Sequence, residues 1–349
     1  MNPIAIRLLS QQLVSPQWSA PAEVVSHMGA LQAQDYRMVR WAVAMRMRKP
    51  SYESLRRSYD KGEIVRLHLL RGTWQMVSAQ DYWWMLSLYC DKATKVVKGW
   101  MKANKVSIDD DELREVRNVM VDYCDKHGSA TKEVFFDALV RRGRVMDKHR
   151  LGYHIRLAEL SGILCSGNLS PMHATFDLAE RKVAHRDYME RDEMLMLLAR
   201  KYFRSHSPAT FEDFVWWTGL SASDCRKATS LLGSELHKMS FGNQEFLLHE
   251  SCRTRGFRRG VAHLLAPFDE YLVGYKSRHL ALAPENASHA YTNNGIFFPI
   301  VALDGMVCGN WSPFSTQPDI RFFSHFPDSS LFDKQWATYC RITKGLKIQ

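Results

Sequence analysis

The sequence lacks the patterns that mark several large protein classes. No apolar run approaches the roughly 20 residues that a membrane span needs, and no apolar stretch of the secretory type opens the chain. The best-known catalytic signatures are also missing, since there is no P-loop, no HExxH, no GxSxG and no Rossmann GxGxxG. We therefore expect a protein without a membrane partner, whose chemistry does not depend on any of these motifs.

Cysteine is scarce and scattered. The seven cysteines are odd in number, and none forms a CxxC pair or joins histidines at the spacing of a metal site. They are Cys90, Cys124, Cys165, Cys225, Cys252, Cys308 and Cys340. This pattern predicts reduced, mostly buried thiols in a cytoplasmic protein, with no bound metal. We expect no cofactor either.

Negative charge is in the minority. The 349 residues carry 47 lysines and arginines against 37 acidic residues, a formal net charge of +10. A basic balance favours phosphate-rich partners, although charge alone says nothing about the fold. The hydrophobic share of 46% and the charged share of 24% are typical of a soluble globular protein. The chain is long enough for about two to four small domains.

The stretch Ser207–His249, with the helix before it, has the pattern of a winged helix-turn-helix. Capping hydroxyls and an early proline at Ser207–Thr210 predict a helix start, and Gly219 predicts the end of that helix. The other expected elements are helices over Glu190–Arg204 and Ala222–Leu232 and strands over Leu236–Phe241 and Glu245–His249. Such a module commonly lays its third helix against DNA, and sometimes only docks proteins.

Versions of the same helix start recur at Ser19–Val25 and Ser129–Phe136. From this repeat we predict a mainly α fold with β structure (α+β), built of three tandem winged helix-turn-helix modules. Short β-like runs from residue 261 onward predict a small β-rich C-terminal domain. The expected boundaries are 1–108, 109–189, 190–260 and 261–349. Unrelated helices with ordinary caps are the alternative to a true repeat.

Gln32 and Gln34 are the first candidates for chemistry. A helix is expected from about Pro21 to Gln34, which places both amides at its far end. Side chains two residues apart point in different directions from a helix but share a face on an extended or turning backbone. Without further information, exposed glutamines at a helix end are the default interpretation.

Several short stretches keep one order from the N-terminus to about Trp311. They are Leu31–Asp35, Leu70–Thr73, Ala79–Tyr82, Leu157–Gly162, Arg200–Phe203, Pro208–Thr210, Trp216–Ser221, Leu264–Leu272 and Asp304–Gly305. Together they resemble the AlkZ/YcaQ-type winged-helix DNA glycosylases, which unhook interstrand crosslinks and remove N7-alkylated guanines. The resemblance implies that Gln32 and Gln34 are the catalytic Gln-x-Gln pair and that Arg71 binds DNA. Gln75 departs from the family pattern, because relatives often carry histidine at this position. This difference bears on which lesion the protein prefers.

Three further features divide between chemistry and structure. Asp269 is the runner-up catalytic candidate, as general base or electrostatic stabiliser, and a carboxylate that holds a turn is the alternative. The segment Arg253–Arg259 suits backbone phosphates, with Phe257 able to wedge against bases, unless it is an ordinary solvated loop. Its arginines are Arg253, Arg255, Arg258 and Arg259. The aromatic clusters Tyr82–Trp84 and Trp216–Trp217 are expected in the core.

The expected function is a monomeric, monofunctional DNA glycosylase. It hydrolyses the N-glycosidic bond of alkylated purines, including N7-alkylguanine and crosslinks, in damaged duplex DNA without metal or cofactor. A noncatalytic winged-helix regulator is the main alternative, and a protein-interaction scaffold is another. A regulator prefers one DNA sequence, a repair enzyme follows damage, and a scaffold lacks salt-dependent affinity for DNA.

Overall fold

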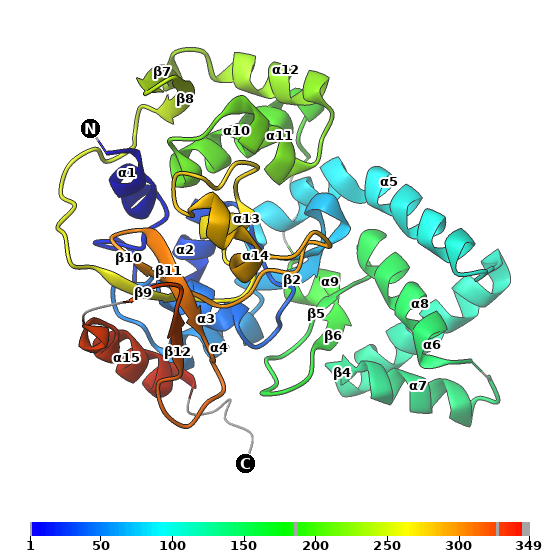
Figure 1. Cartoon of the computed structure of the whole chain (residues 1–349). Coiled ribbons are helices and arrows are strands. Elements are labelled where there is room, and N and C mark those ends of the chain that lie inside the picture. Colours follow the sequence, from blue (N-terminus) through cyan, green and yellow to red (C-terminus); the bar gives the residue numbers. More distant parts are fainter. Residues whose placement is uncertain (1, 145, 185–187, 326–327, 344–349) are drawn as a thin grey trace. The chain divides into compact units, whose positions relative to one another are not determined.

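The computed structural model describes residues 2–144, 146–184, 188–325 and 328–343. The chain forms two compact units, unit 1 from residues 1–55 and 191–349 and unit 2 from residues 56–190 (Figure 1). Unit 1 is thus discontinuous in sequence and brings both ends of the chain into one body. The expected combination of helices with small sheets is confirmed. Among the described helices, none is both long and apolar enough to cross a bilayer.

The predicted third winged-helix segment forms helices and a hairpin as expected. Its elements are α10 (Arg191–His206), α11 (Phe211–Thr218), α12 (Ala222–Leu232), β7 (Leu236–Phe241) and β8 (Gln244–His249). Thr210 and Asp213 form a reciprocal capping box at the start of α11, which satisfies backbone N–H groups that have no partner within the helix. Gly219 ends α11 in the left-handed conformation, and Ser221 caps α12.

The N-terminal part of unit 1 contains α1 (Pro3–Ser10), α2 (Pro21–Met28), β1 (Leu31–Gln32) and α3 (Val39–Ala44), and α4 (Tyr52–Asp60) follows. The prediction of one helix from Pro21 to Gln34 was wrong at its C-terminal end. Gly29 adopts a φ of 75° and stops α2 at Met28. Glycine takes this conformation without the steric cost of a Cβ atom, so the chain leaves the helix and becomes extended at Leu31.

The C-terminal part of unit 1 contains a four-stranded antiparallel sheet in the order β12-β11-β10-β9. Its strands are β9 (Ala262–Leu265), β10 (Ile300–Leu303), β11 (Met306–Trp311) and β12 (Ile320–Phe322). The helices of this part are the short α13 (Glu270–Val273) and α14 (Ala287–Ala290) and the terminal α15 (Asp333–Thr343). The sheet confirms the β-like runs, whereas α15 was not expected.

This sheet shares one hydrophobic core with helices from the N-terminal part of the chain. Trp41 on α3 is fully buried in that core, and its indole Nε1 donates a hydrogen bond of 2.6 Å to the carbonyl of Leu264. Leu8 and Leu9 of α1 and Tyr339 of α15 belong to the same core. Burial of this apolar surface is the main force that assembles the discontinuous unit 1.

Unit 2 combines a hairpin, a long helix and a compact helical segment with its own core. The first elements are β2 (Ile64–His68), β3 (Trp74–Ser78) and α5 (Ala79–Ala103). The later ones are α6 (Asp110–His127), β4 (Ala130–Thr131), α7 (Lys132–Arg141), α8 (Lys148–Leu160), β5 (Leu164–Ser166), β6 (Thr175–Leu178) and α9 (Ala179–Lys182). Side chains of Asp109, Thr131 and Asp147 cap α6, α7 and α8, which is why these helices begin where polar residues predict.

Two segments show the order of elements that defines a winged helix. In unit 2, helix α6, strand β4, helices α7 and α8 and the hairpin β5–β6 follow one another, with sheet order β4-β6-β5. In unit 1, α10, α11, α12 and β7–β8 do the same, and Ala209 pairs with Leu247 in the place of the first strand. The count of three modules, and the boundaries 1–108, 109–189, 190–260 and 261–349, stay predictions.

Candidate active site

Gln32 ends strand β1, and Gln34 follows two residues later in a bend. The Gln32 residue is only 9% exposed, whereas Gln34 is exposed. An extended backbone lets residues two apart share a face, so the end of α2 at Met28 gives the motif the geometry that a continuous helix would deny it. The two amides therefore differ in burial and in backbone, since Gln32 belongs to the strand and Gln34 to the bend after it.

A buried carboxylate holds the backbone of this strand. The Gln32 peptide N–H donates a 2.7 Å hydrogen bond to Oε1 of Glu270, the first residue of α13. The other oxygen, Oε2, accepts from Nε1 of Trp217 at 3.0 Å and lies 3.3 Å from Nε2 of His206. Glu270, Trp217 and His206 are all fully buried. Two N–H groups, from β1 and α11, and the ring nitrogen Nε2 of His206 from α10 thus converge on one carboxylate.

His206 is enclosed on every side. Its ring stacks on Tyr202 at 4.7 Å, and its Nδ1 lies 2.8 Å from the Ser205 hydroxyl. Burial lowers the pKa of His206, and the contact with Glu270 opposes that shift. The neutral ring can donate from Nε2 to Glu270 while Nδ1 accepts from Ser205. The carbonyl of His206 accepts a 2.8 Å bond from the hydroxyl of Tyr275.

Asp269 is adjacent to Glu270 but has different partners. Its side chain caps α13 by accepting from the Tyr271 backbone N–H at 2.9 Å. Both of its oxygens also accept from the guanidinium of Arg46, at 2.6 and 2.9 Å, and both residues are buried. A carboxylate in a bidentate pair and a helix cap has few lone pairs left for a water. These contacts favour the turn-holding alternative over a general base.

Gln11 on the segment after α1 joins the two carboxylate systems. Its Oε1 accepts from Arg46 at 3.0 Å, and its Nε2 donates to the Glu270 carbonyl at 3.2 Å and to the Tyr275 hydroxyl at 3.1 Å. Gln11 is fully buried. Because every donor and acceptor of its amide is used, the network fixes α13 relative to α1 and α3.

The basic segment Arg253–Arg259 lies between β8 and β9. Arg253 donates to the carbonyl of Ser15 at 3.0 Å, so part of its guanidinium serves the fold. Phe257 is partly buried and packs against the hydrophobic core of unit 1, which opposes a role as a free wedge between bases. Arg255, Arg258 and Arg259 are exposed and remain available to phosphates. Their contact with DNA stays a prediction.

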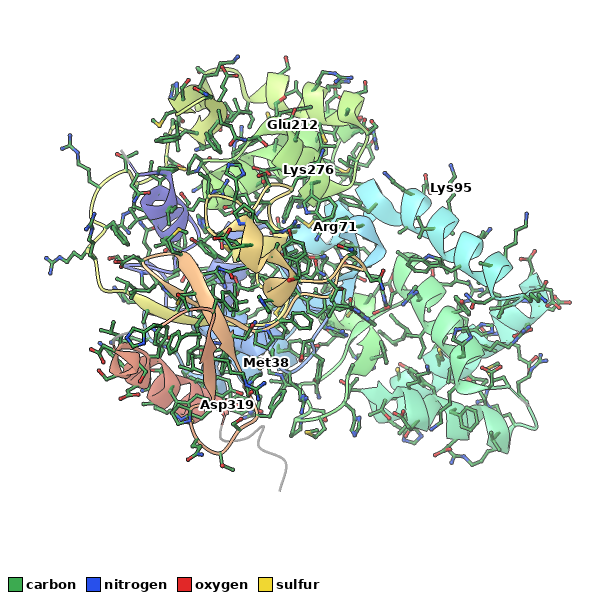
Figure 2. All side chains as sticks on the ribbon, viewed as in Figure 1. Met38, Arg71, Lys95, Glu212, Lys276 and Asp319 are labelled. Atoms are coloured by element: carbon green, nitrogen blue, oxygen red, sulfur yellow. The ribbon has the colours of Figure 1, made fainter. Side chains whose placement is uncertain are left out.

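Arg71 lies in unit 2, at the turn that joins β2 to β3 (labelled in Figure 2). Its φ of 56° is left-handed, an unusual conformation for a residue with a side chain. The turn is closed by the N–H of Leu69 donating to the carbonyl of Thr73 at 3.1 Å. Such a tight turn fixes the direction in which the half-buried Arg71 leaves the hairpin. Its binding of DNA stays a prediction.

Gln75 is fully buried on β3, opposite Leu67. Its Nε2 donates to the Thr73 hydroxyl at 2.8 Å, while its Oε1 has no hydrogen-bond partner in the described part of the chain. A buried carbonyl without a hydrogen-bond donor costs folding free energy. Gln75, which stands where relatives often carry histidine, therefore includes an unsatisfied polar atom.

The residues of the two aromatic clusters differ in burial. Tyr82, Trp83, Trp84 and Trp217 are buried, as expected for core residues. The prediction for Trp216 was wrong, because it is 40% exposed. Successive residues of a helix are turned by about 100°, so Trp216 cannot share the inward direction of its neighbour Trp217.

All seven cysteines are free, as expected, but only Cys124, Cys165 and Cys225 are buried, so the prediction of mostly buried thiols was wrong. Within the described ranges, no group of three histidine, cysteine or acidic side chains is placed to hold a metal ion.

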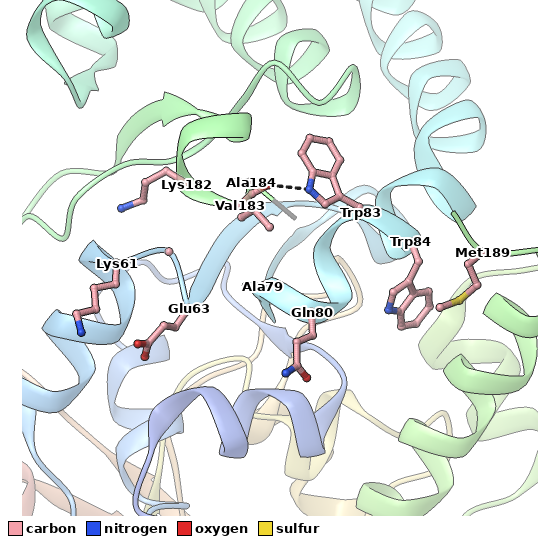
Figure 3. A pocket seen from close by; sticks show the side chains of 11 residues that line it. Lys61, Glu63, Ala79, Gln80, Trp83, Trp84, Lys182, Val183, Ala184 and Met189 are labelled. Carbon is pink, nitrogen blue, oxygen red and sulfur yellow. Dashed lines mark hydrogen bonds between the residues drawn. The ribbon is translucent and has the colours of Figure 1, made fainter. Parts of the chain in front are cut away.

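Unit 2 contains a cavity of about 300 Å³ at the start of α5. Trp83 and Trp84 form part of its wall, and Nε1 of Trp83 donates to the carbonyl of Val183 at 2.8 Å (Figure 3). Lys182, also in the wall, lies 3.2 Å from the Tyr59 carbonyl at the end of α4. None of the predicted site residues lines this cavity. The hydrogen bonds of its wall serve to hold α4, α5 and α9 in place.

Sequence reasoning missed Glu270, His206 and Trp217 as residues of the site. Glu270 was included only as part of the stretch Leu264–Leu272, and Trp217 only as an expected core residue. The local signal was limited to Glu270, which with Asp269 carries the only charges of the stretch Leu264–Val273, whereas His206 stands among polar residues. The contact between Glu270 and Gln32 joins residues 238 positions apart, and His206 and Trp217 reach this site through Glu270, so the cluster leaves no local pattern.

Known proteins resemble this chain in sequence and in fold. The profile of the family described as AlkZ-like DNA glycosylases matches residues 25–316. An interstrand DNA cross-link repair glycosylase of Streptomyces sahachiroi is 27% identical over 319 residues, covering 87% of this chain and 85% of the relative. The solved structure of the S. sahachiroi DNA glycosylase AlkZ superposes with a TM-score of 0.77 at 21% identity, covering 99% of this chain and 96% of that one.

Proposed function

The chain belongs to the AlkZ-like family of DNA glycosylases, and from this premise we propose that it hydrolyses the N-glycosidic bond of N7-alkylated purines in duplex DNA. Membership makes the protein a DNA glycosylase, an enzyme rather than the regulator or scaffold weighed from the sequence. The cross-link repair activity named for the S. sahachiroi relative supports bulky lesions and interstrand crosslinks as further substrates. We also propose that the protein acts as a monomer.

The chemistry of the lesion explains why amides suffice. Alkylation at N7 gives guanine a positive charge, so the base departs as a neutral molecule and no general acid is needed. In the proposed reaction a water oxygen bonds to C1′, the C1′–N9 electron pair leaves with the base, and the water loses its proton to solvent. The enzyme must position the water and stabilise an oxocarbenium-like sugar, which amide dipoles can do without a metal.

The observation that carries the proposal is the position of Gln32 and Gln34 within the matched family region. Gln32 ends the strand whose backbone is anchored by the 2.7 Å bond to Glu270, and Gln34 follows in a bend. Gln34 is exposed, and Gln32 retains 9% exposure, so the motif reaches the protein surface, where a water can be positioned. An anchored strand reduces the reorganisation needed when charge develops at C1′.

Binding of the duplex is proposed to rest on phosphate contacts from three exposed arginines and from the half-buried Arg71. The net charge of +10 gives the sequence-independent attraction. Arg71, Arg255, Arg258 and Arg259 are the side chains that we assign to this role. Lysine and arginine contacts of this kind set the register on DNA but carry no preference for a sequence, which suits an enzyme that follows damage.

The test is release of free base from a duplex that carries one N7-methylguanine. We expect wild type to release 7-methylguanine and to leave an abasic site, and the double variant Gln32→Ala/Gln34→Ala to release it at least about 100-fold more slowly. DNA affinity of the double variant should equal that of wild type, because neither glutamine is assigned to phosphates.

Gln335→Ala on α15 is the matched control, since it removes a half-buried glutamine from a helix of the same unit. Its excision rate should equal that of wild type. An unchanged rate in the double variant would contradict the assigned roles of Gln32 and Gln34. Tight binding without release by wild type would contradict the proposed substrate.

A further inference from the structure

The carboxylate of Glu270 is the only group in the described part of unit 1 that combines full burial, a contact with the Gln-x-Gln backbone and no cationic partner. Unit 1 buries three described acidic residues, Asp213, Asp269 and Glu270. Arg46 neutralises Asp269 at 2.6 Å, and Arg7 lies 3.7 Å from Asp213. Glu270 instead faces three neutral donors.

Those donors are the Gln32 peptide, the Trp217 indole and the His206 ring. The Gln32 peptide and the Trp217 indole can only donate, and the His206 ring donates in its Nε2–H tautomer, so all three contacts suit an ionised carboxylate. Burial lowers the pKa of His206, so the histidine is present as a neutral donor at pH 7. The cluster therefore buries one net negative charge.

A buried net charge is expensive unless something compensates for it. Hydrogen bonds offset part of this cost. If Glu270 served only to anchor the Gln32 backbone, a neutral side chain could accept the same hydrogen bond without the cost of a buried charge. The Gln32 end of the cluster offers a reason to keep the charge. In the proposed reaction, positive charge develops on the sugar next to the Gln32 amide, and a fixed anion in a low-dielectric interior favours that charge.

We propose that Glu270 is a positioning residue for the glycosylase reaction: its carboxylate fixes the Gln32 peptide and supplies the negative potential that stabilises the cationic transition state. The inference rests on the proposed function of Gln32 and Gln34. Glu270 touches no substrate, because it is fully buried, and acts only through β1. Its charge also favours cationic lesions over neutral ones.

Glu270→Gln tests the charge while it keeps the shape. The carbonyl of the new amide can still accept from Gln32, and the neutral His206 ring can switch tautomer to accept from the new NH₂ group. The indole N–H of Trp217 then loses its acceptor, so the same change is also made in a Trp217→Phe background. Glu270→Asp is the complementary variant, because it keeps the charge but withdraws the carboxylate from Gln32.

We expect Glu270→Gln to lower kcat for 7-methylguanine release by about 10- to 100-fold while KM and the Kd for DNA stay unchanged. Glu270→Asp should recover part of that loss. The matched control is Asp213→Asn, a buried carboxylate that bonds the Lys276 and Thr210 backbone N–H groups. It should lower the melting temperature but not the kcat of the folded protein.

Wild-type kcat in a folded Glu270→Gln protein would overturn the inference, as would equal losses in Glu270→Gln and Asp213→Asn. If Glu270→Gln fails to fold in both backgrounds, Glu270→Asp decides: a wild-type kcat would contradict the need for contact with Gln32. Failure of the proposed function is distinct, because it appears as absence of base release by wild type.

Discussion

Asp269 and Glu270 are adjacent in sequence, yet their carboxylates bind different partners. Asp269 stands at the N-cap of α13, where its side chain turns back to the Tyr271 N–H and to Arg46. Glu270 is the first helical residue, and its side chain faces the Gln32 peptide. The capping geometry thus separates two neighbouring acids by direction, and only one of them reaches the Gln-x-Gln strand.

Asp269→Asn separates a structural role from a catalytic one. The substitution leaves the buried Arg46 without its counter-charge, and loss of one partner of a buried pair costs about 3–5 kcal/mol of unfolding free energy. We expect chemical denaturation to show a loss of this size. The excision rate per folded molecule should stay within a few-fold of wild type, and a loss of several hundred-fold at full folding would restore Asp269 as a general base.

At the scale of elements, the segment between β8 and β9 divides its arginines between fold and surface. Arg253 is tied to Ser15, whereas Arg255, Arg258 and Arg259 are exposed. The charge of this segment is therefore available to DNA mainly through three side chains rather than four.

The triple change of Arg255, Arg258 and Arg259 to serine should reduce the salt dependence of DNA binding. Removal of one arginine–phosphate pair reduces the magnitude of the negative slope of log K against log salt by about 0.9. The magnitude therefore falls by about 2.7 if all three arginines bind phosphates. Fluorescence anisotropy over a salt series measures the slope. Arg253→Ser should instead lower stability with a smaller change in slope, and an unaltered slope in the triple variant would show that the segment does not bind DNA.

The capping box of α11 gives a prediction for a single element. Thr210 accepts from the Asp213 N–H, and Asp213 accepts from the Thr210 N–H, both at 3.0 Å and both buried. Thr210→Ala should therefore cost about 1–2 kcal/mol of unfolding free energy. The exposed cap Ser221→Ala on α12 is the comparison and should cost less, because water can replace the hydroxyl there. Equal losses at the two caps would contradict this reasoning.

At the scale of the whole molecule, buried histidines make stability depend on pH. Burial lowers the pKa of His27 to about 4, and it also lowers the pKa of His68, His206 and His263. His27 and His68 are therefore neutral in the folded protein at pH 6, and the pKa values of His206 and His263 are shifted in the same direction, whereas a histidine of the unfolded chain binds its proton near the ordinary value of 6.5. The unfolded state therefore gains protons that the folded state does not.

The unfolding free energy should fall as pH decreases from 6.5 towards 4. The slope is about 1.4 kcal/mol per pH unit for each histidine that takes up a proton only on unfolding. His27→Gln, which keeps a donor for the Ser10 carbonyl, should reduce this slope by up to one proton. Denaturation curves at several pH values measure it. A stability that does not change between pH 6.5 and 5 would contradict the burial of these rings.

Local chemistry of the sequence determined the elements of the predicted third module. Capping side chains at Thr210 and Ser221 and the stop at Gly219 act on their own helices, within a few residues, so their positions could be read directly. The hairpin β7–β8 was predicted for the same reason. The order of short motifs was enough to place the chain near a family of DNA glycosylases, which the match over residues 25–316 confirmed.

Tertiary structure decided the features that depend on distant partners. The helix α2 ends at Gly29 rather than at Gln34, Trp216 stays exposed beside the buried Trp217, and α15 completes a core shared with α1. Above all, only folding brings Glu270 to the Gln32 peptide, across a separation of 238 residues. Hydrogen bonds between buried groups depend on which distant segments pack together, so a local sequence pattern does not predict them.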